Sequence, residues 1–157
     1  MKKTNAMREL DKAKIKYSTQ EYEVDETDLS AVNAALKIGI YIEQVFKTLV
    51  LFNEKKELIV ACIQGNAELD LKKLAKISNS KKVEMLGVKE LLENTGYIRG
   101  GCSPIAIKKR HRAFINESAL NYEQIYISAG VRGTQILINP KDLIKYLNME
   151  VENIIQE

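Results

Sequence analysis

The chain has 157 residues, of which 45% are apolar and 29% charged, values typical of an ordinary globular protein. This composition excludes disordered, collagen-like and coiled-coil chains, and the length allows a buried core without disulfide or metal staples. No apolar run reaches the roughly 18 residues of a membrane span, and no signal-peptide core follows Met1. We therefore expect one cytoplasmic domain over residues 1–157 that makes no contact with a membrane.

The first half of the chain alternates between helical and strand patterns. Apolar spacing predicts a helix over residues 4–14, and alternation predicts a strand over residues 15–22. We expect Asp28 to cap a helix that runs to Lys37 and ends at Gly39. Two apolar runs joined by a polar turn then predict a β-hairpin with strands at 45–52 and 58–63.

The second half mixes shorter elements of both kinds. Helices over residues 70–77 and 88–93 are expected on either side of a strand at 83–86, and residues 96–103 form a glycine-rich loop. Asn139 and Pro140 open a helix that ends at Leu147. Three further strands are predicted at 113–116, 124–128 and 135–138. The pattern predicts a single α/β (or α+β) domain with a mixed sheet of six or seven strands.

Positive charge is concentrated in one part of the chain. The formal net charge is only +3, yet residues 71–116 carry eleven Lys and Arg against three Glu. The segment Lys108-Lys109-Arg110-His111-Arg112 lies in a stretch without any acidic residue, from Thr95 to Asn116. Such a segment favours a phosphate backbone as its partner, although a solvated basic face is the common alternative.

Few residues are available for metal binding or for an enzymic nucleophile. Cys62 and Cys102 are the only cysteines, and His111 is the only histidine. A zinc site built from Cys and His side chains would have at most three ligands. Any catalytic Ser-His-Asp or Cys-His arrangement would have to use His111. We expect neither a metal nor another cofactor.

Lys47 is the most informative residue of the sequence. It lies within the apolar strand run at 45–52, where its side chain shares a face with Val45, Leu49 and Leu51. Burying an unpaired ammonium costs several kcal/mol. The side chain therefore either reaches solvent at the strand end or points into a polar cavity that receives negative charge.

Two glycine-rich segments could contribute main-chain donors to such a cavity. The segment from Gly96 to Pro104 contains Gly100 and Gly101 next to Cys102 and Ser103, a composition that lets N–H groups converge on a ligand oxygen. A second turn, residues 128–133, contains Gly130 and Gly133. Plain tight turns are the alternative in both cases.

Taken together, these segments resemble the YbaK/EbsC family, the stand-alone relatives of the editing domain of bacterial prolyl-tRNA synthetase. The resemblance spans nearly the whole chain in the family's order. The segments that carry it are Phe46-Lys47-Thr48-Leu49, Asp70-Leu71-Lys72-Lys73-Leu74-Ala75, Lys81-Lys82-Val83-Glu84-Met85, Thr95-Gly96-Tyr97, Gly100-Gly101-Cys102-Ser103-Pro104, Lys108-Lys109-Arg110, Tyr126-Ile127-Ser128, Gly130 and Arg132-Gly133.

The resemblance implies a central mixed sheet or barrel surrounded by helices, and deacylation of a mischarged tRNA, foremost Cys-tRNA(Pro). Lys47 matches the strand lysine of the family, and we expect it to form a catalytic group with the main chain of Gly100, Gly101, Cys102 and Ser103. The resemblance also implies substrate contacts from Tyr22, Thr48, Pro104, Ser128, Gly130 and Gln135, and tRNA contacts from Lys108, Lys109, Arg110 and Arg112. Gln135 departs from the family, which typically has an acidic residue shortly after the Arg-Gly turn, so the edited amino acid stays open.

The implied mechanism is substrate-assisted. Main-chain amides of residues 100–103 would stabilise the oxyanion, Lys47 would hold the ribose-phosphate or the same negative charge, and the cysteinyl thiol or the 2′-hydroxyl would supply the nucleophile or base. Two alternatives remain: a deacylase for another small residue such as Ala-tRNA(Pro), and a tRNA-binding module without catalysis. Prolyl-tRNA synthetase is a candidate partner, and a monomer is the default expectation.

Overall fold

The computed structural model describes residues 2–157, which form a mixed α/β arrangement of eight strands, five α-helices and two 3₁₀ helices. None of the helices within these residues is both long and apolar enough to cross a bilayer. In chain order the elements are α1 (Asn5–Lys12), β1 (Tyr17–Glu21), α2 (Ala31–Ile38), a 3₁₀ helix (Ile42–Gln44), β2 (Phe46–Asn53), β3 (Leu58–Gln64), α3 (Leu71–Ile77), β4 (Val83–Met85), α4 (Val88–Thr95), β5 (His111–Asn116), a second 3₁₀ helix (Glu117–Asn121), β6 (Ile125–Ser128), β7 (Thr134–Ile138), α5 (Pro140–Leu147) and β8 (Glu150–Glu152).

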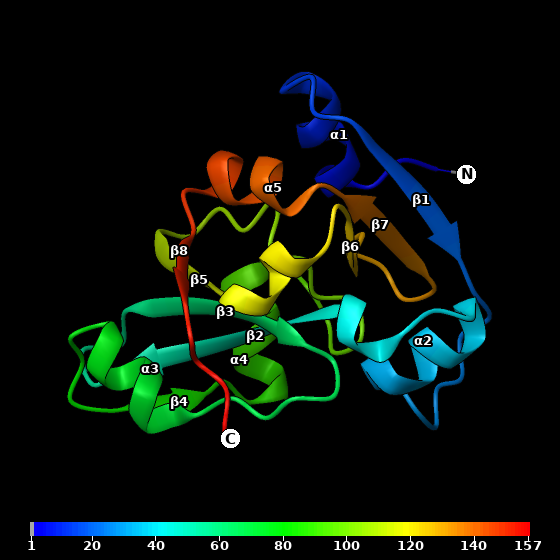
Figure 1. Cartoon of the computed structure of the whole chain (residues 1–157). Coiled ribbons are helices and arrows are strands. Elements are labelled where there is room, and N and C mark those ends of the chain that lie inside the picture. The colour runs from blue at the N-terminus through cyan, green and yellow to red at the C-terminus, as the bar shows by residue number, and fades with distance from the viewer. Residues whose placement is uncertain (1) are drawn as a thin grey trace.

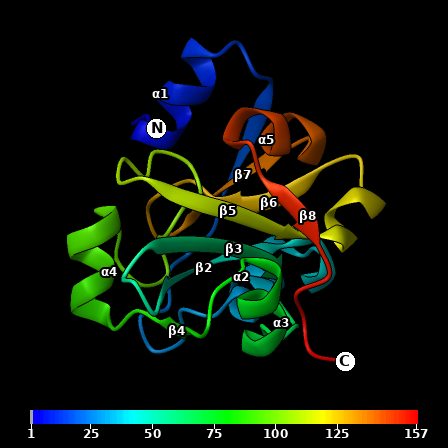
Figure 2. The same cartoon turned by 90° about the vertical axis from the view of Figure 1, so that its left-hand side faces the viewer.

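The strands form two sheets rather than one. A three-stranded antiparallel sheet has the order β1-β7-β6, and a five-stranded mixed sheet has the order β4-β2-β3-β5-β8. Figure 1 shows the smaller sheet with α1 in the upper part of the molecule, and Figure 2 shows α4 to the left of β2 and β3 and α3 at the lower right. A single parallel bridge between Val45 and Tyr126 joins the edges of the two sheets.

The core fills the space between the sheets because each presents an apolar face to the other. Phe46 and Ile115 of the large sheet belong to the same buried cluster as Ile127 and Ile136 of the small sheet. α1 and α5 close this cluster with Met7, Leu10 and Leu143. On the other face of the large sheet, Leu74 of α3 packs into a second cluster that contains Phe114. A third cluster contains Val50 and Phe52, so the side chains of β2 are packed along most of the strand.

The expected elements are present, and the differences have local causes. Gly39 ends α2 with φ of 82°, and Asp70 and Asn139 cap α3 and α5 through their side chains. The cap of α2 is Ser30 and not Asp28, because Ser30 Oγ accepts the Asn33 N–H while Asp28 accepts the N–H of Ser30. The expected single sheet of six or seven strands is wrong in detail. The eighth strand, β8, is three residues long and too polar to be recognised by its pattern.

Candidate functional site

A cavity of about 480 Å³ lies where the two sheets separate. Its walls come from β2, from α2, from the connection between β4 and α4, and from the glycine-rich loop before β5. The volume lies within the range of small-molecule sites. Seven of the residues expected at the site border this cavity: Tyr22, Lys47, Thr48, Gly100, Cys102, Ser128 and Gln135.

The cavity opens on an unpaired stretch of the β2 edge. The N–H of Gly65 donates to Val45 O, and the N–H of Asn53 donates to Glu57 O. The main-chain N–H and C=O groups of the odd-numbered residues of β2 therefore point toward β3. The N–H of Leu86 donates to Val50 O from the opposite side. By this alternation the main chain of Thr48 faces away from β3, between the pairing with β4 that begins at Leu51 and the bridge at Val45. A ligand in the cavity therefore meets both a donor and an acceptor of the backbone.

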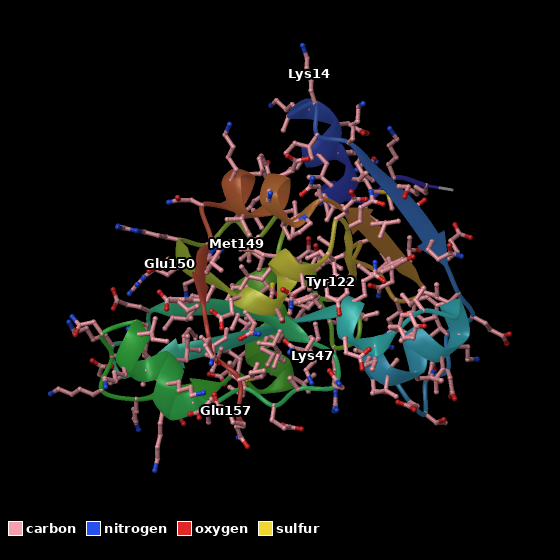
Figure 3. All side chains as sticks on the ribbon, viewed as in Figure 1. Lys14, Lys47, Tyr122, Met149, Glu150 and Glu157 are labelled. Carbon is pink, nitrogen blue, oxygen red and sulfur yellow. The ribbon has the colours of Figure 1, made fainter. Side chains whose placement is uncertain are left out.

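Lys47 of β2 borders this cavity, and Figure 3 marks its position in the molecule. The residue is half-buried, and its Nζ donates to the carbonyl oxygen of Gly65 at 3.2 Å. None of the ion pairs in residues 2–157 includes Lys47. The geometry fits the cavity alternative for this side chain, and it leaves a positive charge that a bound anion can neutralise.

The small sheet contributes polar groups from the other side. Ser128 of β6 is paired with Gln135 of β7. The hydroxyl of Ser128 accepts the N–H of Gly130 at 3.2 Å and so stabilises the following turn. Gln135 is only 6% exposed, and its Oε1 has no hydrogen-bond partner in the described part of the chain. A half-turn of the terminal amide exchanges its oxygen and nitrogen, so Gln135 can offer either group to a ligand.

The glycine-rich loop presents only part of its backbone to the cavity. Gly100 has φ of 85° and borders the cavity together with Cys102. No acceptor for the N–H of either residue lies within residues 2–157. The N–H of Gly101, in contrast, donates to Ile98 O at 2.9 Å and closes a turn. Among residues 100–103, Gly100 and Cys102 are therefore the ones that border the cavity and have main-chain N–H groups without an acceptor within residues 2–157.

Three other expected residues support the loop and do not line the cavity. Ser103 is fully buried, and its Oγ accepts the N–H of Ile105 at 3.2 Å. Pro104 is buried beside it. Gly130 has φ of 99° and packs so close to the Tyr97 ring that an added Cβ would lie 2.9 Å from it. These three residues fix the shape of the loops that form the cavity.

The two cysteines are poorly suited to act as nucleophiles. Burial raises the pKa of the Cys102 thiol to about 12, and it raises the pKa of Cys62 to about 12 as well. A thiol with such a pKa is almost fully protonated near neutral pH, and the thiolate is the reactive form. Cys62 is completely buried in the core, as expected for a small apolar residue. No group of three possible metal-ligating side chains lies within residues 2–157.

The residues of the basic segment 108–112 differ in their contacts with the rest of the protein. The guanidinium of Arg112 donates to both carboxylate oxygens of Glu150 at 2.9 and 2.7 Å, and to Ser78 O at 2.7 Å. It also lies 5.0 Å from the centre of the Phe114 ring. These contacts hold the guanidinium in place at the surface, and the expected tRNA contact of Arg112 stays a prediction. Lys108 and Arg110 are exposed.

Two features of the site were not expected from the sequence. Arg99 borders the cavity and adds a second cationic residue to the walls that contain Lys47. Its carbonyl oxygen accepts a hydrogen bond from Arg132 Nε at 2.9 Å, which links the two glycine-rich turns. The open edge at Thr48 was also missed, because it depends on which strands pair with β2. For Arg99 the sequence offered one signal, its place next to Gly100 in a stretch without acidic residues.

Comparison with known proteins assigns the family. Residues 25–146 match the model of the aminoacyl-tRNA editing domain. The chain belongs to the aminoacyl-tRNA editing domain family. Its relative EbsC from Enterococcus faecalis, provisionally named a Cys-tRNA(Pro)/Cys-tRNA(Cys) deacylase, is 47% identical over 97% of this chain and 93% of EbsC. The resemblance inferred from the sequence segments is thereby confirmed.

Solved structures of editing-domain fold agree with this assignment. A protein described provisionally as a trans-editing enzyme for prolyl-tRNA synthetase superposes with a TM-score of 0.80 at 23% identity, over 90% of this chain and 87% of that chain. The protein APE2540 superposes with a TM-score of 0.87 at 17% identity, over 95% and 97% of the two chains. At these identities the likeness confirms the fold, a mixed α/β domain.

Proposed function

We propose that this editing-domain protein is a hydrolase that deacylates mischarged aminoacyl-tRNA, with Cys-tRNA(Pro) as its foremost substrate. The observation that carries the proposal is the cavity itself. Lys47, with its cationic side chain, and Gly100 and Cys102, whose main-chain N–H groups are unpaired within the described residues, all line it. The name of EbsC, a relative that shares nearly half of its residues with this chain, points to the same reaction.

An aminoacyl ester needs little more than positioning and charge stabilisation. When a nucleophile attacks the ester carbon, negative charge develops on the carbonyl oxygen before the bond to the ribose oxygen breaks. The N–H groups of Gly100 and Cys102 would donate to that oxygen, and Lys47 would balance the charge of the oxyanion or of the adjoining phosphate. The substrate supplies the nucleophile or base through its thiol or its 2′-hydroxyl, since both enzymic thiols are protonated.

Recognition of the amino acid would fall to the groups opposite Lys47. The amide oxygen of Gln135 would accept a hydrogen bond from the substrate's α-ammonium group, and the main chain of Thr48 would contact the same moiety. Because Gln135 carries no charge, it contributes less to binding of the α-ammonium group than a carboxylate would. Tyr22 and Ser128 would complete the walls around the side chain of the substrate.

The tRNA would be bound outside the cavity. Lys108 and Arg110 are exposed and would contact phosphates, with Lys109 beside them. A domain of this size offers little surface for reading the identity of a tRNA, so prolyl-tRNA synthetase would supply tRNA(Pro) selection. We propose that the protein acts as a monomer in the cytoplasm, where tRNA charging takes place.

The test uses tRNA(Pro) charged separately with cysteine, alanine and proline, and follows loss of the ester. The proposal expects rapid deacylation of Cys-tRNA(Pro) and little deacylation of Pro-tRNA(Pro). Lys47→Met, which keeps the alkyl chain and removes the charge, should abolish the reaction. Faster deacylation of Ala-tRNA(Pro) would reassign the substrate, and tRNA binding with all three esters intact would show a binding module without catalysis.

A further inference from the structure

Three separate loops bring basic residues together at the far end of β2. Leu58 at the start of β3 pairs with His111 in parallel register, which places the turn at 54–57 beside residues 108–110. Val83 pairs with Asn53, and the N–H of Lys81 donates to Glu54 Oε1 at 2.9 Å, which adds the segment before β4. We call this area the three-loop basic surface. It consists of Lys55, Lys56, Lys81, Lys108, Lys109 and Arg110.

The packing of the lysines shows that the loops converge. The Nζ atoms of Lys56 and Lys109 lie 5.5 and 5.4 Å from the centre of the same Phe52 ring. The two ammonium groups are therefore within about 11 Å of each other, although the residues are 53 positions apart in the sequence. Lys109 also donates to Asn94 Oδ1 at 2.6 Å, which attaches the surface to the end of α4.

The surface has an excess of positive charge that the protein does not neutralise. Residues 53–57, 80–84 and 108–110 contain seven basic and three acidic residues. All three carboxylates are engaged locally, since Glu54 accepts the N–H of Lys81, Glu57 accepts from Asn53 Nδ2, and Glu84 forms an ion pair with Lys82 at 3.6 Å. None of the ion pairs within residues 2–157 involves a member of the surface. Such a surface fits a polyanionic backbone.

Helix α4 connects this surface to the cavity. Its first residue, Val88, borders the cavity, and Asn94 near its end binds Lys109. Val88 and Leu92 are one turn apart, and they are 67% and 51% exposed. Exposed apolar side chains at this spacing form a stripe that runs from the cavity toward the basic surface. Unpaired bases could pack on this stripe without sequence preference.

The distance between the two sites matches the dimensions of an RNA end. Lys47 and Phe52 are five residues apart on β2, which corresponds to about 17 Å along the strand. A stacked strand advances about 3.4 Å per nucleotide, so this path accommodates about five stacked nucleotides or fewer extended ones. That length is the scale of the unpaired 3′ end that follows the acceptor stem of a tRNA.

We infer that the three-loop basic surface binds the backbone of the tRNA acceptor stem, and that the exposed face of α4 guides the unpaired 3′ end into the cavity. The inference rests on the proposed function for the identity of the RNA. It extends the contact area beyond residues 108–110 to the turn of the β2–β3 hairpin. The contact is made with phosphates and is independent of nucleotide sequence.

The experiment measures the affinity for uncharged tRNA(Pro) as a function of salt, so that its result does not depend on hydrolysis. The double variant Lys55→Glu, Lys56→Glu should bind at least tenfold more weakly at low salt, and should lower the slope of log K against log salt by about 1.8. The matched control is Lys14→Glu, Lys16→Glu, two exposed lysines beyond α1, and Figure 3 shows Lys14 at the end of the molecule remote from Lys47. The control variant should bind as the wild type does.

A second variant separates the helix from the charges. Leu92→Ser should weaken tRNA binding about fivefold and leave the salt slope unchanged, because it removes an apolar contact and no charge. Equal affinity and equal slope for the Lys55, Lys56 variant and the control would overturn the inference. Hydrolysis of cysteinyl-adenosine, which reaches only the cavity, should be the same in wild type and in all of these variants. Its absence in the wild type would count against the proposed function alone.

Discussion

Gln135 offers a test in which stability and activity should change in opposite directions. In the free protein its Oε1 is buried and has no hydrogen-bond partner among residues 2–157, and a buried unsatisfied polar group costs about 1–3 kcal/mol. Gln135→Leu has nearly the same volume and removes that group. We expect the free energy of unfolding to increase by about 1–2 kcal/mol, which corresponds to a melting temperature about 3–6 °C higher for a chain of this size.

The same substitution should damage catalysis. If Gln135 accepts a hydrogen bond from the α-ammonium group of the substrate, its loss is worth about 1.5–3 kcal/mol, and kcat/KM should fall by about 10-fold to 150-fold. The assay is deacylation of Cys-tRNA(Pro) under single-turnover conditions, together with thermal unfolding of the same preparations.

The matched control is Gln20→Leu. Gln20 lies directly opposite Gln135 in the β1–β7 register, but it is exposed, so neither its stability nor its activity should change appreciably. A lower melting temperature for Gln135→Leu would show that the amide is satisfied in the folded protein. Unchanged kcat/KM would show that it does not contact the substrate.

Further predictions concern the remaining groups of the site and the basic segment. Lys47→Met should abolish deacylation with an unchanged melting temperature, whereas His111→Ala should keep most of the activity; an inactive but folded His111→Ala would contradict a substrate-assisted reaction. Cys102→Ser should retain deacylation, since the wild-type thiol has a pKa of about 12 and is protonated at working pH. In the folded protein the pKa of Cys62 is raised from 9.0 to about 12, so the thiol loses its proton at a lower pH in the unfolded chain than in the folded one. The free energy of unfolding should therefore be unaffected by this group below pH 9 and should fall between pH 9 and 12. The contribution of Cys62 is about 1.4 kcal/mol per pH unit, and Cys62→Ala should reduce the slope of unfolding free energy against pH by that amount. Arg112→Ala should lower stability by roughly 1 kcal/mol, discounted because its ion pair with Glu150 is nearly half exposed. A Kd for tRNA that rises with this substitution would support the tRNA contact expected from the sequence, and an unchanged Kd would contradict it.

Much of the secondary structure could be predicted because its causes are local. Helix caps at Asp70 and Asn139, and the left-handed end of α2 at Gly39, depend only on residues within one turn. The β2–β3 hairpin follows from two apolar runs and the polar turn between them. The choice of Ser30 over Asp28 as the cap of α2 shows the limit of this reasoning, since both residue types cap helices and only the backbone decides between them.

The sequence also pointed to the cavity through Lys47. A cation within an apolar strand needs a polar surrounding, and that physical requirement holds whatever the topology. The residues opposite it could be proposed only through the resemblance to a family. No local signal indicates that Gln135 lies across the cavity from β2, because that placement depends on the pairing of β6 with β7 and on the bridge at Val45.

By itself the sequence determined most of the elements, the place of Lys47 within an apolar strand, and the family. The tertiary structure decided which strands leave the edge of Thr48 open, which loop amides reach the cavity, and that Arg112 is held by Glu150 while Lys55 and Lys56 join the basic surface. The physical reason is the range of the interactions. Propensity, periodicity and capping act over a few residues, whereas strand pairing and charge clustering join positions that are far apart in the chain.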